Sequence, residues 1–330
     1  MSTHSSSLDR VAVIGAGPAG MSAALWLQCL GFYPVLIESA NHPGGMQRFN
    51  FLKNEWLLGQ INVTGPELCE KFVTHMAEKN IPLHTSCVVQ AIQKLERDFS
   101  LTLRTDFTRV VTNRYRAIII ATGLRYRAEE VLISVPGFET LEADDVAYGP
   151  YAFLATEGCE GKRVLIVGGG DNAFENAIHL LRQGAEVFLV CRSTPRAQAR
   201  LCEEAESFGQ AWRSYRYARI QKFCRTPDGI EVLLSYGERK ETLRVQRIHV
   251  LAGYMPNTTF LGQALGPLHP ALRFDAAGYL EVDSWGRTSI AGIYAAGDVC
   301  NPDFPNVVSA IASGAKAAKA VEIDSRADRA

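Results

Sequence analysis

The stretch that decides the fold is Arg10-Val-Ala-Val-Ile-Gly15-Ala-Gly17-Pro18-Ala19-Gly20. A run rich in β-branched residues ends there in three glycines spaced Gly-x-Gly-x-x-Gly. Apolar side chains then recur at helical spacing, at Ala23, Trp26, Leu27 and Leu30. Gly31 supplies a helix C-cap, and the next apolar run ends in Glu38. The pattern predicts a strand, a glycine turn, a helix and a second, parallel strand.

Each glycine of this turn has a physical reason. Gly15 lets the chain turn sharply, Gly17 has no Cβ to keep a pyrophosphate off the backbone, and Gly20 lets the helix pack on the strand. The helix N-terminus offers free N–H groups and a partial positive charge to phosphates. Glu38 would accept hydrogen bonds from the hydroxyls of an adenosine ribose and repel a 2′-phosphate. We expect dinucleotide contacts from Gly15, Gly17, Pro18, Ala19, Gly20, Glu38 and Ser39.

A second stretch, Lys162-Arg-Val-Leu-Ile-Val-Gly168-Gly-Gly170-Asp171-Asn172-Ala173, has the same shape. The helical stripe that follows consists of Phe174, Ala177, Ile178 and Leu181. Gly184 ends that helix, and residues 185–192 form the next strand. Two such units predict an α/β fold with two Rossmann-like dinucleotide-binding domains. At the second turn we expect nucleotide contacts from Gly168, Gly170, Asp171, Asn172 and Ala173.

The composition excludes several classes of function. The net charge is −1, so we expect neither nucleic acid nor anionic membrane as a partner. No run offers the roughly 20 apolar residues of a transmembrane helix, and the first residues have no pattern of a secretory signal. We therefore expect a cytoplasmic protein. The 8 cysteines include no Cys-x-x-Cys pair and no zinc spacing, so no metal site is expected. Residues 125–145 turn polar and acidic, and we interpret them as a linker.

Further short motifs follow along the chain. In order they are Gly44-Gly45, Gly65-Pro66-Glu67-Leu68, Ala121-Thr122-Gly123, Gly253-Tyr-Met-Pro-Asn257 and Gly292-Ile-Tyr-Ala-Ala-Gly297-Asp298. Together with the two glycine turns, these motifs resemble the flavoproteins built like low-molecular-weight thioredoxin reductase, over about residues 10–323. The resemblance implies two Rossmann-like domains, the second inserted into the first. Residues 1–125 and 254–330 would then form the FAD-binding domain, and residues 126–253 the inserted NAD(P)-type domain.

The resemblance also implies a set of FAD contacts. Gly45 to Gln47 would approach the flavin or its ribityl chain, and Asp298 would bind the ribityl hydroxyls. Asn306 and Val307, at a helix start, would face the pyrimidine side of the ring, where a partial positive charge suits a reduced, anionic flavin. The full set is Gly45, Met46, Gln47, Val89, Ala121, Thr122, Gly123, Gly297, Asp298, Asn306 and Val307.

The chain departs from thioredoxin reductases in its cysteines. The family's redox-active Cys-x-x-Cys would fall within Val146-Ala-Tyr-Gly149-Pro-Tyr-Ala152, where no sulfur is present. Thiol–disulfide exchange needs a thiolate that attacks a neighbouring sulfur, so that chemistry cannot run at this place. In this respect the chain looks more like the ferredoxin/flavodoxin–NADP reductases of the thioredoxin-reductase type. Cys300, next to the flavin motif, remains a candidate catalytic thiol.

A second departure concerns the nucleotide. Relatives that use NADPH clamp its 2′-phosphate with two arginines, and the corresponding positions here hold Ser193 and Ala197. Arg192 and Arg196 could still supply positive charge. Two functions therefore remain open: an FAD enzyme linking NAD(P)H to an acceptor such as ferredoxin or flavodoxin, or a nucleotide-independent diflavin thiol/disulfide oxidoreductase with a second FAD in this site. The resemblance further implies a homodimer and, as partner, a small redox protein or a thiol/disulfide.

Overall fold

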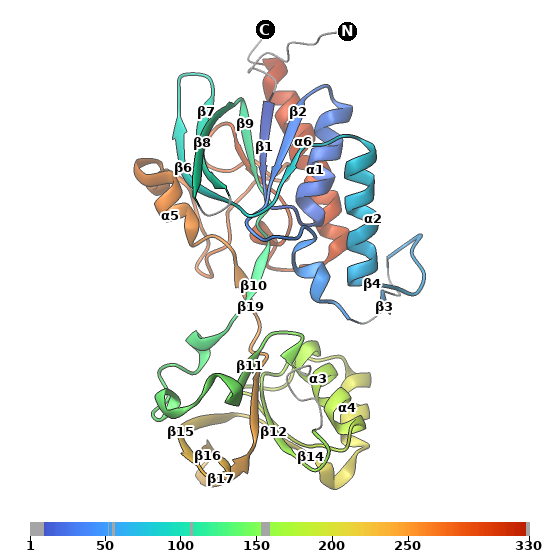
Figure 1. Ribbon diagram of the computed structural model, residues 1–330, viewed down its shortest axis with the longest axis vertical. Coiled ribbons are helices and arrows are strands. Elements are labelled where there is room, and N and C mark those ends of the chain that lie inside the picture. The colour runs from blue at the N-terminus through green and yellow to red at the C-terminus, as the bar shows by residue number, and fades with distance from the viewer. Residues whose placement is uncertain (1–9, 52, 55–56, 106–107, 153–158, 328–330) are drawn as a thin grey trace. The chain divides into compact units, whose positions relative to one another are not determined.

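The computed structural model describes residues 10–51, 53–54, 57–105, 108–152 and 159–327. The chain forms two compact units (Figure 1). Unit 1 combines the chain up to Arg125 with Met255 onward, and unit 2 is Tyr126–Tyr254. The sequence placed these changes after residues 125 and 253. Within the described residues, no helix is both long and apolar enough to cross a membrane.

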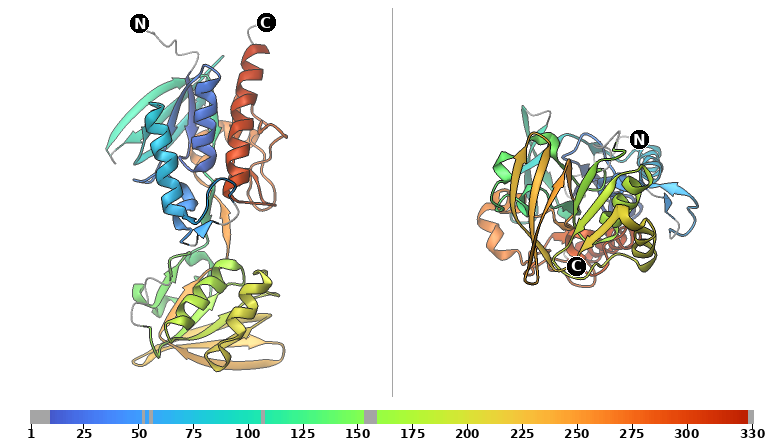
Figure 2. Two further views of the ribbon diagram at one scale, coloured as in Figure 1. Left: turned by 90° about the vertical axis from the view of Figure 1, so that its right-hand side faces the viewer. Right: turned by 90° about the horizontal axis from the view of Figure 1, so that it is seen from below.

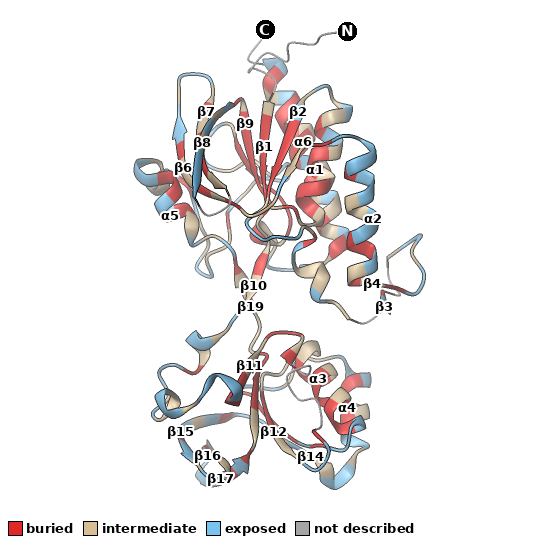
Figure 3. Ribbon diagram, viewed as in Figure 1, coloured by how far each residue is buried: buried red, intermediate tan, exposed pale blue. Residues whose placement is uncertain are grey.

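Unit 1 is built on a parallel five-stranded sheet with the order β20-β9-β1-β2-β5. Its strands are β1 (Arg10–Ile14), β2 (Tyr33–Ile37), β5 (Leu83–His84), β9 (Ala117–Ile120) and β20 (Ile293–Ala295). After their first residues, Arg10 and Tyr33, strands β1 and β2 are apolar and buried, as is β9, which is expected for strands covered on both faces (Figure 3). Their carboxyl ends meet at one edge, which is where the glycine turn leaves β1.

Two layers cover this sheet. One face packs on α1 (Pro18–Cys29), α2 (Gly65–Glu78) and α6 (Val307–Ala327). The other packs on an antiparallel sheet of β6 (Cys87–Lys94), β7 (Phe99–Thr105) and β8 (Arg109–Tyr115), and on α5 (Phe260–Leu265). Helices α1 and α6 lie side by side (Figure 2), so closely that a Cβ on Gly314 would come within 2.2 Å of the Ala19 carbonyl oxygen. Small residues therefore set this helix contact.

Unit 2 repeats the plan on a smaller scale. Its parallel sheet has the order β11-β18-β12-β13-β14. The strands are β11 (Val146–Tyr148), β12 (Arg163–Val167), β13 (Glu186–Val190), β14 (Trp212–Tyr215) and β18 (Arg247–Val250). The helices are α3 (Asp171–Arg182) and α4 (Ala199–Glu206). An antiparallel sheet of β15 (Ala218–Thr226), β16 (Gly229–Tyr236) and β17 (Arg239–Val245) forms a separate layer (Figure 2) that shares one core with the parallel sheet.

The chain passes between the units in two short strands, β10 (Leu124–Tyr126) and β19 (Tyr254–Pro256), which pair with each other. The interpretation of residues 125–145 as a linker is wrong. This segment forms three short 3₁₀ helices, and Leu132, only 2% exposed, belongs to the core of unit 2. The Phe223 N–H donates to the Pro136 carbonyl at 2.8 Å, which ties the segment to β15. The many acidic residues of this segment indicated a linker, although its apolar residues pack into the core.

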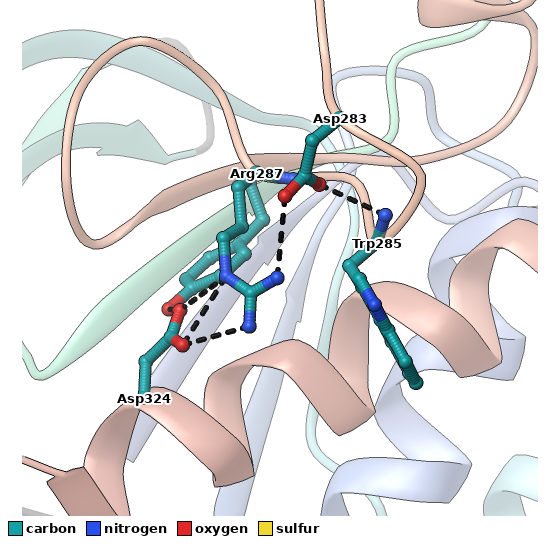
Figure 4. Close-up of polar contacts among 5 residues, drawn as sticks. Asp283, Trp285, Arg287 and Asp324 are labelled. Atoms are coloured by element: carbon teal, nitrogen blue, oxygen red, sulfur yellow. Dashed lines mark hydrogen bonds and ion pairs between the residues drawn. The ribbon is translucent and has the colours of Figure 1, made fainter.

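The C-terminal half of α6 is held by a polar cluster (Figure 4). The Arg287 guanidinium donates to both carboxylate oxygens of Asp324, with the Nε–Oδ2 distance at 2.9 Å, and also pairs with Asp283. The Tyr294 hydroxyl donates to Asp324 at 2.8 Å. These contacts hold the pKa of Asp324 below its ordinary value. The cluster fixes α6, whose other end carries Asn306 and Val307.

Candidate functional site

The first glycine turn lies between β1 and α1. Gly15 has a φ of +105°, and a Cβ there would lie 2.4 Å from the Ala121 carbonyl oxygen. A Cβ on Gly20 would lie 1.9 Å from the Gly15 carbonyl oxygen. Both positions therefore require glycine for packing. Gly17, the N-cap of α1, is different, because a Cβ there would meet only the Gly45 Cα at 3.9 Å among the described residues. No side chain of the described residues caps α1, so its first N–H groups have no side-chain acceptor there.

Glu38 fixes the strand that ends beside this turn. One carboxylate oxygen accepts the Ala16 N–H at 2.8 Å, and the other accepts the Ala40 N–H at 2.8 Å. The Ser39 hydroxyl also donates to this carboxylate, at 3.3 Å. A carboxylate has about four acceptor directions, so it retains capacity for ribose hydroxyls. The Gly44 N–H donates to the Ala16 carbonyl at 2.8 Å, which brings Gly45 and the residues after it to the turn.

Asp298 and Gln47 each have a buried polar atom that could bond to a ligand. Oδ1 of Asp298 and Nε2 of Gln47 are buried and have no hydrogen-bond partner among the described residues. Burial raises the pKa of Asp298 to about 6, although the Asn306 N–H bonds its carboxylate. Buried polar atoms in native proteins are nearly always paired, so both atoms fit a polar ligand such as a ribityl chain. The residues of unit 1 thus fit an FAD.

Other expected FAD residues line the same edge of the sheet. The Ala121 N–H donates to the Ile14 carbonyl at 2.7 Å, so the chain of residues 121–123 runs beside the glycine turn. The Thr122 hydroxyl donates to the Asn257 carbonyl at 2.9 Å. Gly297 packs on α1, since a Cβ there would lie 2.7 Å from the Ala19 Cβ. The remaining residues of this set are exposed or half-buried nearby in the chain: Pro18, Gly45, Met46 and Gly123.

Asn306 begins α6 with its side chain. Its Oδ1 accepts the N–H groups of Val308 at 2.9 Å and Ser309 at 3.0 Å, so the helix starts one residue later, at Val307. The Val307 side chain is buried against α2 residues. The start of α6 is therefore a fixed helix end with a partial positive charge.

Two of the expected site residues, Val89 and Cys300, have side chains that are not placed for the roles expected of them. The Val89 side chain on β6 is buried in the core between the sheets, which leaves its backbone as the part that a ligand could contact. Cys300 donates its thiol hydrogen to the Gly297 carbonyl at 3.3 Å. Burial raises the pKa of Cys300 to about 12, with the Asp298 charge adding to the effect. A thiol with such a pKa is not a nucleophile at neutral pH, so these features favour a structural role for Cys300.

The second glycine turn lies between β12 and α3. A Cβ on Gly168 would lie 2.2 Å from the Leu251 carbonyl oxygen. No atom of the described residues would lie within 4 Å of a Cβ on Gly170, the N-cap of α3. Ala173 is fully buried where the first turn has a glycine. Like α1, helix α3 therefore begins at an open space with no side-chain cap from the described residues.

The loop after β13 is bonded to this turn. The Arg196 N–H donates to the Gly169 carbonyl at 2.7 Å. Asp171, the first residue of α3, accepts the backbone N–H of Gln198 at 2.9 Å and its side-chain amide at 2.8 Å. Arg192, Ser193 and Arg196 are exposed on the same loop. No acidic residue stands at the end of β13, in contrast to Glu38 at the end of β2.

Two further residues near α3 were not anticipated from the sequence. Burial raises the pKa of Glu175 to about 7, with Asp171 raising it further and Arg200 lowering it. The Asn172 side-chain amide donates to the Tyr254 hydroxyl at 2.7 Å, and burial raises the pKa of Tyr254 to about 12. Glu175 lies one helical turn after Asp171, whereas nothing in their spacing marks Gln198 or Tyr254 as neighbours of the turn. Only the fold brings them together.

The segment where thioredoxin reductases carry their cysteine pair is aromatic here. The described residues 146–152 lie in and after β11 and include Tyr148 and Tyr151. Gly149 has a φ of +82° and packs against the Tyr126 ring, since a Cβ on Gly149 would lie 2.9 Å from a carbon of that ring. All 8 cysteines of the chain are free thiols. This segment cannot form a disulfide.

Both turns and their open helix starts define an α/β flavoprotein with two dinucleotide-binding units. The sequence matches the profile of the pyridine nucleotide-disulphide oxidoreductases over residues 9–314, and the chain belongs to this family. It is a flavin-dependent oxidoreductase with the fold of the thioredoxin reductases.

Individual relatives agree with this assignment. The chain is 26% identical to the thioredoxin reductase of Bacillus subtilis, over 94% of this chain and 93% of that protein. It is 28% identical to an NADH dehydrogenase of Ferdinandcohnia aciditolerans over 93% of this chain, which spans 56% of that longer protein. The solved thioredoxin reductase of T. acidophilum superposes with a TM-score of 0.80 at 25% identity, over 96% of this chain and 99% of that one.

Proposed function

We propose that unit 1 binds FAD and unit 2 binds NADPH, and that electrons pass from NADPH through the flavin to an external acceptor. A small redox protein such as a ferredoxin or flavodoxin is the proposed acceptor. The observation that carries the proposal is the second glycine turn with its open helix start, together with the end of β13 beside it. That strand end is followed by the exposed Arg192 and Arg196 and by no acid. A pyrophosphate suits the helix start, and the arginines suit a 2′-phosphate.

The residues of the chain would bind and orient the two cofactors. Bound FAD supplies the redox chemistry, accepting a hydride from a nicotinamide and releasing electrons to an acceptor. Glu38 would hold the adenosine ribose, and Asp298 would pair its free Oδ1 with a ribityl hydroxyl. The start of α6 after Asn306 would stabilise negative charge on the ring. No cysteine is required for these steps.

Electrons would leave without an internal disulfide. Residues 146–152 contain no sulfur, and Cys300 is a buried thiol with a raised pKa. The match to a relative named NADH dehydrogenase supports a nicotinamide nucleotide as the electron donor. We also propose that the protein is a homodimer, which light scattering after gel filtration tests.

One observation favours a second candidate, a diflavin thiol/disulfide oxidoreductase with FAD in both units. Ser193 and Ala197 occupy the positions where NADPH-dependent relatives carry arginines, and the open space before Gly170 would accept any dinucleotide pyrophosphate. In that case the protein would not respond to NADPH.

Rapid anaerobic mixing with NADPH or NADH tests the nucleotide assignment. We expect NADPH to reduce the flavin, and Arg192→Ala to raise the apparent Kd for NADPH roughly ten- to a hundred-fold while leaving NADH unchanged, because one charge-assisted phosphate contact is lost. Arg239→Ala, which removes an exposed arginine from β17, is the matched control and should change neither. If neither nucleotide alters the flavin spectrum, the proposal fails and the second candidate is favoured.

The acceptor is tested separately. With NADPH as donor, we expect turnover with a ferredoxin or flavodoxin and none with thioredoxin. Rapid reduction of thioredoxin would show that some other cysteine pair of this chain is redox-active and would contradict the proposal.

A further inference from the structure

Three hydrogen bonds clasp the loop after β13 to the start of α3. Asp171 accepts both N–H donors of Gln198, from its backbone and its side chain, and the Arg196 N–H donates to Gly169. With its amide nitrogen bound to Asp171, the Gln198 side chain turns its oxygen to the other side. This clasp fixes the first residues of α4 beside the second glycine turn.

The hydrogen bonds between Asp171 and Gln198 also position Arg200. Its Nε donates to the Gln198 Oε1 at 3.1 Å, and its charge is close enough to Glu175 to lower the pKa of that carboxyl. Glu175 lies one turn after Asp171 on α3. The Arg200 guanidinium therefore lies near the first turn of α3. Among the described residues, neither Arg192 nor Arg196 has a side-chain hydrogen bond to Gln198 as Arg200 does.

The acidic residues at the start of α3 make a nearby positive charge favourable for binding an anion. A dinucleotide pyrophosphate is an anion, and Asp171 and Glu175 place two carboxyl groups on the first turns of the helix that would bind it. The negative charge of these carboxyl groups repels a phosphate, which weakens the attraction of the helix start for an anion. A guanidinium at Arg200 offsets this repulsion and can donate two parallel hydrogen bonds to phosphate oxygens.

We propose that Arg200, positioned by Gln198, binds the pyrophosphate of the nucleotide in unit 2, whereas Arg192 and Arg196 read the 2′-phosphate. The inference rests on the proposed nucleotide site. It assigns the arginines of one loop to two ends of the same ligand. Arg200 then sets how tightly any adenine dinucleotide binds, and Arg192 sets the preference for NADPH over NADH.

Calorimetric titration of the flavin-loaded protein with NADPH, NADH and ADP-ribose separates these roles. We expect Arg200→Ala to weaken all three by about tenfold, with the ratio of NADPH to NADH affinity unchanged. Arg192→Ala should weaken NADPH alone. Because Arg200 is exposed, both variants should keep the melting temperature of the wild type.

The positioning role of Gln198 has its own readout. Gln198→Ala should weaken the three ligands in the wild-type background and have no further effect in the Arg200→Ala background, because its contribution passes through that arginine. Equal losses in both backgrounds would overturn the positioning role. If Arg200→Ala changed the NADPH to NADH ratio as Arg192→Ala does, or changed no affinity, the assignment of Arg200 to the pyrophosphate would be wrong. If the wild type bound none of the three ligands, the proposed function itself would fail, and this inference with it.

Discussion

The two glycine turns of this protein share their backbone contacts and differ in their side chains. In each, a carbonyl from a neighbouring strand end leaves no room for a Cβ on the first glycine: Ala121 lies against Gly15, and Leu251 lies against Gly168. In each, a later loop donates an N–H to the carbonyl of the following residue. The shared backbone produces an open helix start, which suits the pyrophosphate of any dinucleotide.

The side chains around the turns differ in charge. Beside the first turn, Glu38 ends the strand and α1 has no acid in its first turn. Beside the second turn, the strand is followed by Arg192, and the acid is Asp171 on the helix. A carboxylate at the strand end repels a 2′-phosphate, and an arginine attracts it. The backbone of both turns suits dinucleotides in general, and we propose that a few side chains select which one binds.

The third position of each motif gives the largest expected difference. In unit 1, Gly20→Ala places a Cβ 1.9 Å from the Gly15 carbonyl oxygen, which forces the backbone to move. We expect a cost of about 3 kcal/mol or more and loss of bound flavin. The reverse change in unit 2, Ala173→Gly, should cost about 1–2 kcal/mol through helix propensity and a lost methyl group. Thermal unfolding with flavin fluorescence measures both. Equal costs would show that the two turns are not packed as described.

The strand ends give the next difference. Glu38→Ala leaves the N–H groups of Ala16 and Ala40 without their acceptor, so we expect a loss of about 1–3 kcal/mol and weaker FAD retention. In unit 2, Arg192 lies one residue beyond the position that matches Glu38. Arg192→Ala removes an exposed side chain and should change stability by less than about 0.5 kcal/mol. Chemical denaturation of both variants measures these changes in the free energy of unfolding. A Glu38→Ala protein as stable as the wild type would show that this carboxylate has no structural role.

The smallest expected difference concerns Glu175 on α3, whose effect on stability depends on pH. Burial and Asp171 raise the pKa of Glu175 to about 7 in the folded protein, from 4.5 when exposed. Ionisation therefore costs stability, a cost that is absent below pH 4.5, grows between pH 4.5 and 7, and is complete above pH 7. Glu175→Gln should be more stable than the wild type by about 1–2 kcal/mol at pH 8, with the gap closing toward pH 4.5.

Glu203→Gln, at an exposed position on α4, is the control for this variant and should show no such pH-dependent gain. A Glu175→Gln protein less stable than the wild type at pH 8 would contradict the buried-acid assignment.

The sequence predicted the elements that repeat a local pattern. Both strand–turn–helix–strand units are present, with Gly15, Gly20 and Gly168 packed as expected. The stripe of Phe174, Ala177, Ile178 and Leu181 is buried. On the first helix the apolar residues also recur at helical spacing, but Trp26 is 47% exposed. Periodicity identifies a face of a helix, but it cannot show how far the neighbouring layer extends over that face.

Contacts between distant segments could not be read from the sequence. Gln198 and Asp171 meet because β13 returns the chain to the start of α3, and their spacing follows no motif. The unpaired Oδ1 of Asp298 likewise becomes visible only when its neighbours are in place. Patterns predict secondary structure from local period, whereas a binding site depends on which loops share the edge of a sheet.

The central claim is that the two turns hold different dinucleotides, FAD in unit 1 and NADPH in unit 2. The most direct test is to count the flavin released per chain on denaturation and to record the absorbance of the native protein during anaerobic addition of NADPH. We expect about one FAD per chain and loss of the oxidised flavin bands as NADPH is added. Two flavins per chain, with no absorbance change in a large excess of NADPH, would contradict the claim.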